Sequence, residues 1–151
     1  MKLYCRSATT GIEYCPEDSI HLVNPKQVLF YICRGVTIQD VFPSRKYDDG
    51  EKTLVFCVNK KESHCAYQEW LVQTKLDASI LEDISLTKPS ADEVFVLNIK
   101  QVIFYLNHKA KLLGMYPIMD WRSHDPVLAF AFNKQDTKEI FHEWKQNKAR
   151  A

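Results

Sequence analysis

The stretch that decides the fold is Asn24-Pro25-Lys26-Gln27-Val28-Leu29-Phe30-Tyr31, because a close copy of it follows later in the chain. The copy, Asn98-Ile99-Lys100-Gln101-Val102-Ile103-Phe104-Tyr105, begins 74 residues further on. Extending the match aligns residues 18–73 with residues 92–147 without a gap, and 14 of the 56 aligned pairs are identical. In the first copy the identical positions are Asp18, Asn24, Lys26, Gln27, Val28, Phe30, Tyr31, Pro43, Leu54, Phe56, Asn59, Lys60, Glu69 and Trp70. A match of this length predicts an internal duplication.

Each copy is predicted to fold as a β-α-β-β-α unit. The last two strands form a hairpin, because the alternation of Leu54, Phe56 and Val58 turns one face of a strand inward. Pro43 and Pro117 are predicted to close the middle strand of each copy. The predicted strands cover residues 20–23, 36–42 and 53–58 in the first copy and 94–97, 110–116 and 127–132 in the second.

The helices are predicted from their first turns. Asn24 is an N-cap residue, Pro25 suits the first helical position, and Gln27 at the third position completes a capping box. Asn59 is predicted to cap the second helix, which would carry an inward apolar stripe at helical spacing. The second copy repeats this pattern, with the stripe residues Ala66, Tyr67, Trp70 and Leu71 matched by Ile140, Phe141 and Trp144.

The fold class expected from these elements is α+β. Residues 1–17 precede the first copy and are predicted to form a β-hairpin, and residues 74–91 link the copies. Residues 148–151 form a short tail after the second copy. Because each unit of 18–73 or 92–147 is small, we expect the two to pack with pseudo-twofold symmetry into one compact domain. The result is either one mixed sheet or two small sheets packed together.

The overall composition is that of a soluble globular protein. The chain has 151 residues, 46% of them hydrophobic and 26% charged, with a net charge of +1. No apolar run approaches the ~20 residues of a membrane span, and the start of the chain lacks the apolar core of a signal peptide. We therefore expect a cytoplasmic location, in a bacterium or an infected host cell, as a monomer or homodimer without membrane contact.

The cysteines do not predict a disulfide framework or a metal site. Their number is odd and no secretion signal accompanies them. Combinations with His21 or His64 have poor spacing for zinc, so we predict reduced thiols, no metal and no cofactor. The five cysteines are Cys5, Cys15, Cys33, Cys57 and Cys65.

No catalytic set stands out, and we expect a protein that is not an enzyme. The run Asp48-Asp49-Gly50-Glu51-Lys52 lacks the acidic-x-Lys step of metal nucleases and has the residues of a turn. His64 and Cys65 would point to different sides of a helix, so they do not form a base and nucleophile.

Two features remain that the fold does not explain. The predicted hairpin loops 43–52 and 117–126 are long and carry aromatic and basic residues, which either anchor an interface or fold back on the core. Lys60 and Lys134 are predicted at the first position of a helix, where they would contact an anion or an acidic partner, or remain solvated. The candidate partner-binding residues of the loops are Arg45, Lys46, Tyr47, Met119, Trp121 and Arg122.

The first copy combines a helix that ends near Gly35, the run Val41-Phe42-Pro43, a charged loop, the run Leu54-Val55-Phe56 and a closing helix, and the second copy follows this pattern loosely. This pattern resembles small uncharacterised domains encoded by phages and mobile elements of Gram-positive bacteria, here in tandem. The second copy departs from the pattern with Lys109 in place of Gly35. The resemblance implies a genomic setting rather than an activity, and no functional residue follows from it.

We expect a non-enzymatic binding protein that contacts a host protein or protein complex. A phage or mobile-element origin would make it an inhibitor of a host defence or regulatory complex. The first alternative is a nucleic-acid-binding accessory or regulatory protein whose phosphate contacts are Arg45, Lys60, Arg122 and Lys134. The second is a metal-dependent hydrolase or nuclease that uses Asp48.

Overall fold

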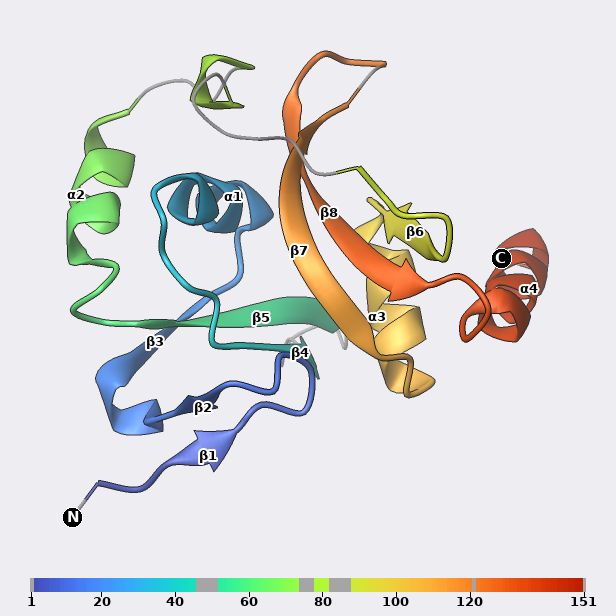
Figure 1. Ribbon diagram of the computed structural model, residues 1–151, viewed down its shortest axis with the longest axis horizontal. Helices are drawn as coiled ribbons and strands as arrows, with labels where there is room; N and C mark the ends of the chain where they lie inside the picture. The colour runs from blue at the N-terminus through green and yellow to red at the C-terminus, as the bar shows by residue number, and fades with distance from the viewer. Residues whose placement is uncertain (1, 46–51, 74–77, 82–87, 121, 151) are drawn as a thin grey trace.

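The computed structural model describes residues 2–45, 52–73, 78–81, 88–120 and 122–150. Within these residues the chain is a mixed α+β fold, with four α-helices and three small antiparallel sheets (Figure 1). The smallest sheet is the predicted N-terminal hairpin, in which β1 (Cys5–Arg6) pairs with β2 (Glu13–Tyr14). A short 3₁₀ helix, η1 (Pro16–Asp18), follows this hairpin.

The first half of the chain forms a three-stranded sheet in the order β3-β5-β4. The order of elements is the predicted β-α-β-β-α. Its elements are β3 (Ser19–Leu22), α1 (Pro25–Cys33), β4 (Asp40–Arg45), β5 (Lys52–Asn59) and α2 (His64–Val72).

The second half forms another three-stranded sheet, in the equivalent order β6-β8-β7. Ser19 pairs with Asn59 in the first sheet, and Glu93 pairs with Asn133 at the same offset in the second. The two halves therefore form two small sheets, as in the second of the two predicted arrangements, and not one mixed sheet. The elements are β6 (Glu93–Val96), α3 (Ile99–Asn107), β7 (Leu112–Met119), β8 (Pro126–Asn133) and α4 (Lys138–Arg150).

The first helix of each half packs against the sheet of the other half. Helix α1 packs against β7 and β8 of the second half, and α3 packs against β4 and β5 of the first. Buried residues of both halves form one hydrophobic cluster, in which the rings of Phe56 and Phe130 lie 6.3 Å apart. Each sheet thus buries its apolar face partly under a helix of the other half.

The predicted caps of α1 and α3 are confirmed, but the reciprocal bonds of the capping boxes are not. The Asn24 side chain accepts from the Lys26 N–H at 3.0 Å. The Gln27 side chain does not reach back to the cap; its Nε2 donates to Tyr31 Oη at 3.0 Å. The second half repeats both bonds 74 residues on, at 2.9 and 3.1 Å. Gln27 and its counterpart therefore fix a tyrosine one turn further along the helix.

The predicted closure of the middle strands at proline is wrong. Pro43 lies within β4 and Pro117 within β7. Both strands are at the edge of their sheets, where a proline need not donate a ladder bond. Because β7 ends at Met119 and β8 begins at Pro126, the connection between them is shorter than the predicted loop 117–126.

The second helices also differ from the prediction. Helix α2 begins at His64 and α4 at Lys138, each after a turn that follows the asparagine. The predicted inward stripe is only partly buried, since Ala66 is buried whereas Tyr67 and Leu71 are exposed.

The linker contributes to the core. Its 3₁₀ helix η2 (Ala78–Leu81) contacts α1, β7 and β8, and Leu81 is buried.

Candidate functional site

The structure describes only part of the predicted hairpin-loop site. Met119 ends β7 with an exposed side chain, and the Arg122 N–H donates to Asp120 Oδ1 at 2.9 Å within the turn. The backbone of Arg45 ends β4, whereas its side chain lies outside the described part of the chain. Lys46, Tyr47 and Trp121 lie outside the described residues. The interface role of these loops remains a prediction.

Lys60 and Lys134 do not stand at the start of a helix. The backbone N–H of Lys60 donates to the Asp18 carbonyl at 2.8 Å, and that of Lys134 donates to the Asp92 carbonyl at 2.7 Å. These N–H groups are therefore already bonded, in contrast to the free N–H groups of a helix N-terminus that bind anions. Both lysine side chains are exposed, and an anion contact by the side chains alone remains a prediction.

A groove of about 940 Å³ lies beside β6 in the second half. It is lined by Val94–Leu97, by the turn before α4 and by Phe141 on that helix. Gln101 and Tyr105 of α3 also line it. Its volume lies at the upper end of the range for ligand pockets, and most of its lining is apolar, as such sites usually are.

The groove runs along the open edge of β6. Successive side chains of a strand point to opposite faces of the sheet, yet four consecutive residues from Val94 to Leu97 line this groove. A cavity that touches all four must border the edge of the strand itself. Among the described strands, β6 pairs with β8 on one side alone, so this edge offers backbone groups to a partner.

The register shows which backbone groups face the groove. Asp92 and Lys134 lie opposite each other and share a ladder bond, so the bonded pairs that follow are Val94 with Phe132 and Val96 with Phe130. The intervening residue, Phe95, must therefore direct its N–H and C=O away from β8. One donor and one acceptor thus face the open side of the sheet.

The polar part of the groove is held in place by the α3 hydrogen bond. Gln101 Nε2 donates to Tyr105 Oη at 3.1 Å, and burial raises the pKa of the Tyr105 phenol. The rim carries charges of both signs. The charged residues that line the groove are Asp92, Lys134, Asp136 and Lys138.

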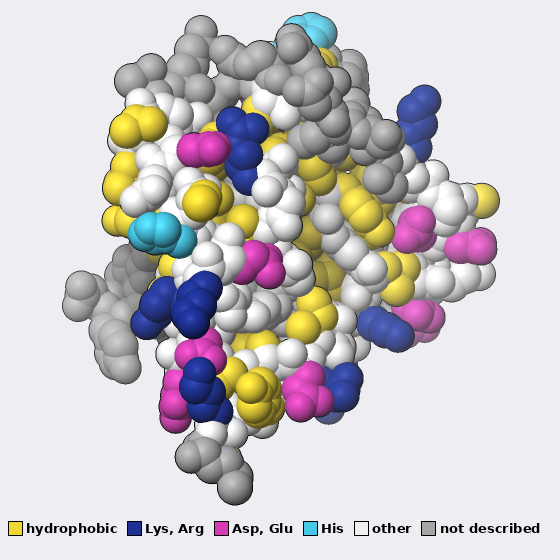
Figure 2. Space-filling model, turned by 60° about the vertical axis from the view of Figure 1, so that its left-hand side comes forward, with side chains coloured by type: hydrophobic (Ala, Val, Ile, Leu, Met, Phe, Trp, Pro, Cys, Tyr) yellow, Lys and Arg dark blue, Asp and Glu magenta, His cyan; other side chains and the backbone are white. Residues whose placement is uncertain are grey.

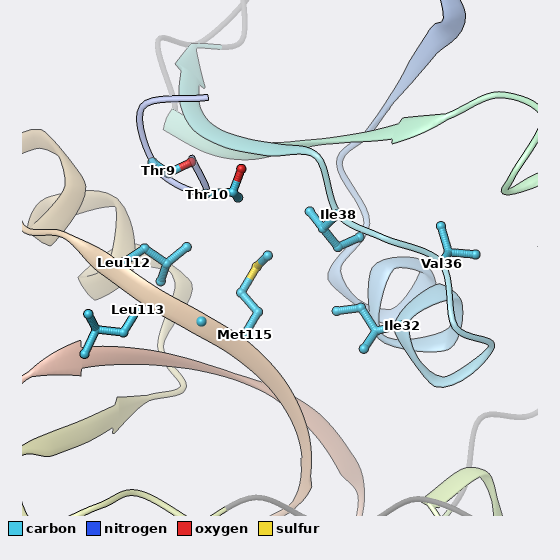
Figure 3. A pocket seen from close by; sticks show the side chains of 9 residues that line it. Thr9, Thr10, Ile32, Val36, Ile38, Leu112, Leu113 and Met115 are labelled. Carbon is cyan, nitrogen blue, oxygen red and sulfur yellow. The ribbon is translucent and has the colours of Figure 1, made fainter. Parts of the chain in front are cut away.

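A second, smaller cavity of about 290 Å³ lies between the two halves (Figure 3). Ile32 of α1 and Ile38 face Leu112 and Met115 of β7 across it, with Thr9 and Thr10 of the N-terminal loop at one end. The two threonine hydroxyls donate to the backbone carbonyls of Val41 and Gln39. The cavity therefore offers apolar contact, and its hydroxyls serve to hold the loop against β4.

A polar cluster around Asp40 holds the N-terminal hairpin. Ser7 Oγ donates to Asp40 Oδ1 at 2.6 Å, and Tyr14 Oη donates to Asp40 Oδ2 at 2.5 Å. Burial, followed by the bond to Asp40, raises the pKa of the Tyr14 phenol. Because Ser7 and Tyr14 are buried and fully engaged, this cluster is structural.

The described residues contain no group of three His, Cys, Asp or Glu side chains placed to hold a metal ion. The carboxylates of Asp48, Asp49 and Glu51 lie outside those residues. All five cysteines are free thiols. In the part of the chain that is described, no helix has the length and apolar character needed to cross a bilayer.

Sequence reasoning assigned the groove residues to fold positions and missed the groove itself. The available signal was an apolar side chain after each first strand (Val23, Leu97) and an aromatic on each second helix (Tyr67, Phe141). The helical spacing of Tyr67 and Phe141 predicts core positions, because sequence alone does not show which face of α4 the neighbouring helix covers.

Comparisons with family models, with curated proteins and with solved structures found no match to this chain.

Proposed function

We propose that this chain is a non-enzymatic binding protein that recognises another protein through the groove beside β6. The observation that carries the proposal is the groove along an open strand edge, lined by four consecutive strand residues. An edge of this kind binds an extended segment by main-chain hydrogen bonds, while pockets beside it select side chains. Phe141 and Leu97, which are 39% and 41% exposed, supply the apolar contacts.

The charges favour a protein partner over a nucleic acid. Asp92 and Asp136 stand beside Lys134 and Lys138 on the groove rim, so a phosphate backbone would meet as many acids as bases. Figure 2 shows a different face of the molecule, on which basic and acidic side chains are also intermixed. With a net charge of +1, these surfaces suit a polypeptide with side chains of both signs.

The two-unit architecture supports a duplicated origin. Both halves have the same element order, the same sheet order and equivalent registers at an offset of 74 residues. We infer an internal duplication whose copies pack about a pseudo-twofold axis. From the resemblance to phage and mobile-element domains, we further propose that the partner is a host defence or regulatory complex and that the protein acts in the cytoplasm.

The test is a quantitative pull-down from the native host lysate after nuclease treatment, with the wild type and two variants. Phe141→Ser alters the groove, and Leu71→Ser alters an exposed apolar residue of α2 outside it. The proposal expects one protein partner to survive nuclease treatment, to be lost with Phe141→Ser and to be retained with Leu71→Ser.

A partner that disappears with nuclease would favour the nucleic-acid alternative. A partner lost with Trp121→Ala or Tyr47→Ala but not with Phe141→Ser would move the interface to the hairpin loops. Circular dichroism of each variant shows whether it is folded.

A further inference from the structure

We propose, building on the proposed function, that the open edge of β3 is a second binding edge and that the chain binds two copies of one extended polypeptide segment.

The edge of β3 is open in the same way as that of β6. Asp18 and Lys60 share the ladder bond that corresponds to the one between Asp92 and Lys134. The following bonded pairs then place His21 where Phe95 stands in the second half, with its backbone N–H and C=O directed away from β5. Among the described strands, β3 pairs with β5 alone.

Residues that line the groove beside β6 have counterparts beside β3. Val23 and Tyr67, the counterparts of Leu97 and Phe141, are 56% and 44% exposed. Gln27 Nε2 donates to Tyr31 Oη at 3.0 Å, as its counterpart does on the floor of the groove beside β6. The first half therefore presents the same apolar and polar groups beside an open edge.

The repetition is selective. The neighbouring exposed residues Leu71 and Val72 correspond to Lys145 and Gln146, so their apolar character is not shared between the halves. By contrast, exposed apolar side chains recur at both positions that flank the open edges. Packing does not require an exposed aromatic, so a shared binding role is the simplest reason for its presence in both halves.

The occupant that fits is an extended segment with apolar side chains at alternate positions and charges of both signs nearby. The free donor and acceptor at the strand edge require a partner backbone that is not engaged in a helix. Lys60 and Asp18 beside β3 match Lys134 and Asp92 beside β6, so both edges carry a base and an acid, whereas Glu62 accepts from the Thr37 N–H. A polyanion would not find charge complementarity at either rim.

The open edges of β3 and β6 cannot share one short segment. Figure 1 shows β3 and β6 on opposite sides of the molecule, separated by the packed core. The chain therefore binds two separate copies and joins two partner molecules. This arrangement predicts a stoichiometry of two segments per chain.

The experiment selects phage-displayed random linear peptides on the folded full-length protein and titrates a selected synthetic peptide by isothermal calorimetry. We expect two peptides per chain for the wild type and for Leu71→Ser. Each of Tyr67→Ser and Phe141→Ser should bind one, and the double variant should bind none. The backbone amide resonances of His21 and Phe95 should both shift on binding.

One peptide per chain, lost with Phe141→Ser and insensitive to Tyr67→Ser, would overturn the second binding edge at β3 and leave the proposed function intact. A library that yields no binder, or binding insensitive to both variants, would overturn the proposed function as well. A selected peptide that binds as a helix, with unshifted edge amides, would overturn the extended occupant. Thermal unfolding confirms that each variant is folded before titration.

Discussion

At the scale of single residues, the ends of α1 and α3 show how the same backbone accommodates different side chains. The Val36 N–H donates to the Tyr31 carbonyl, and Ala110 repeats this bond, which closes each helix with a left-handed residue. That residue is Gly35 with φ 84° in the first half and Lys109 with φ 65° in the second. A lysine is strained there, whereas glycine is not.

Replacing Lys109 by glycine should therefore stabilise the protein. We expect Lys109→Gly to raise the free energy of unfolding by roughly 0.5–1 kcal/mol, because relief of left-handed strain outweighs the added entropy of the unfolded chain. Gly35→Lys should lower it by a comparable amount. Urea unfolding followed by circular dichroism measures both. A destabilised Lys109→Gly variant would mean that the lysine side chain makes a stabilising contact.

The bond between Tyr14 and Asp40 should make stability depend on alkaline pH. The pKa of Tyr14 is raised in the folded state, so the folded protein keeps a proton that the unfolded chain loses above about pH 10. The stabilisation is complete below that pH and is lost as the pH rises further. Tyr14→Phe should cost roughly 1–2 kcal/mol at neutral pH, where the bond to a carboxylate is lost.

The stability difference between wild type and Tyr14→Phe should then narrow above about pH 10, since the variant lacks this titration. Urea midpoints between neutral pH and pH 11 measure the difference. A constant difference across that range would show that Tyr14 titrates alike in the folded and unfolded states.

At the scale of elements, the 3₁₀ helix η2 anchors the segment that joins the halves. Leu81 is 4% exposed and belongs to an element that contacts α1, β7 and β8. Leu81→Ala should therefore destabilise the protein by about 2–4 kcal/mol, as expected for a buried leucine. Leu71→Ala, at a position 61% exposed, is the matched control and should have little effect. Equal unfolding midpoints for the two variants would contradict a structural role for the linker.

The elements that the sequence predicts well are those with local chemical signals. Asn24 predicts the start of α1, and the alternation of Leu54, Phe56 and Val58 predicts a strand with an inward face. The predicted strand ends at Pro43 and Pro117 are wrong, because a strand at the edge of a sheet can continue through a proline. Whether a strand lies at a sheet edge depends on tertiary structure. Lys60 is predicted at the start of a helix but lies in a turn. The Asn59 side chain accepts from a backbone N–H three residues on in this turn, as an N-cap does at a helix start.

The groove could not be predicted for a related reason. Phe141 has the spacing of a core residue, and its exposure depends on how α4 packs against α3. The open edge of β6 likewise depends on the order of the strands. Sequence periodicity reports which residues share a face, and the packing of elements decides whether that face is covered.

At the scale of the whole molecule, each half depends on the other for the burial of its sheet, because the first helix of each half packs on the sheet of the other. Helix α1 contacts the second sheet and α3 contacts the first, within one hydrophobic cluster. Residues 1–73 and 78–151, expressed separately, should each lack cooperative thermal unfolding, and mixing them should restore it. Calorimetry of the fragments and of their mixture provides the test. Two fragments that each unfold cooperatively alone would show independent domains.

In the proposed complex, a partner segment joins the sheet at the open edge of β6. The most direct measurement is residue-resolved amide hydrogen exchange of the full-length protein with and without a selected peptide. We expect slower exchange at the Phe95 amide in the complex, because its outward N–H gains a bond to the partner backbone. Protection confined to the β7–β8 turn at residues 120–125, with Phe95 unchanged, would contradict it.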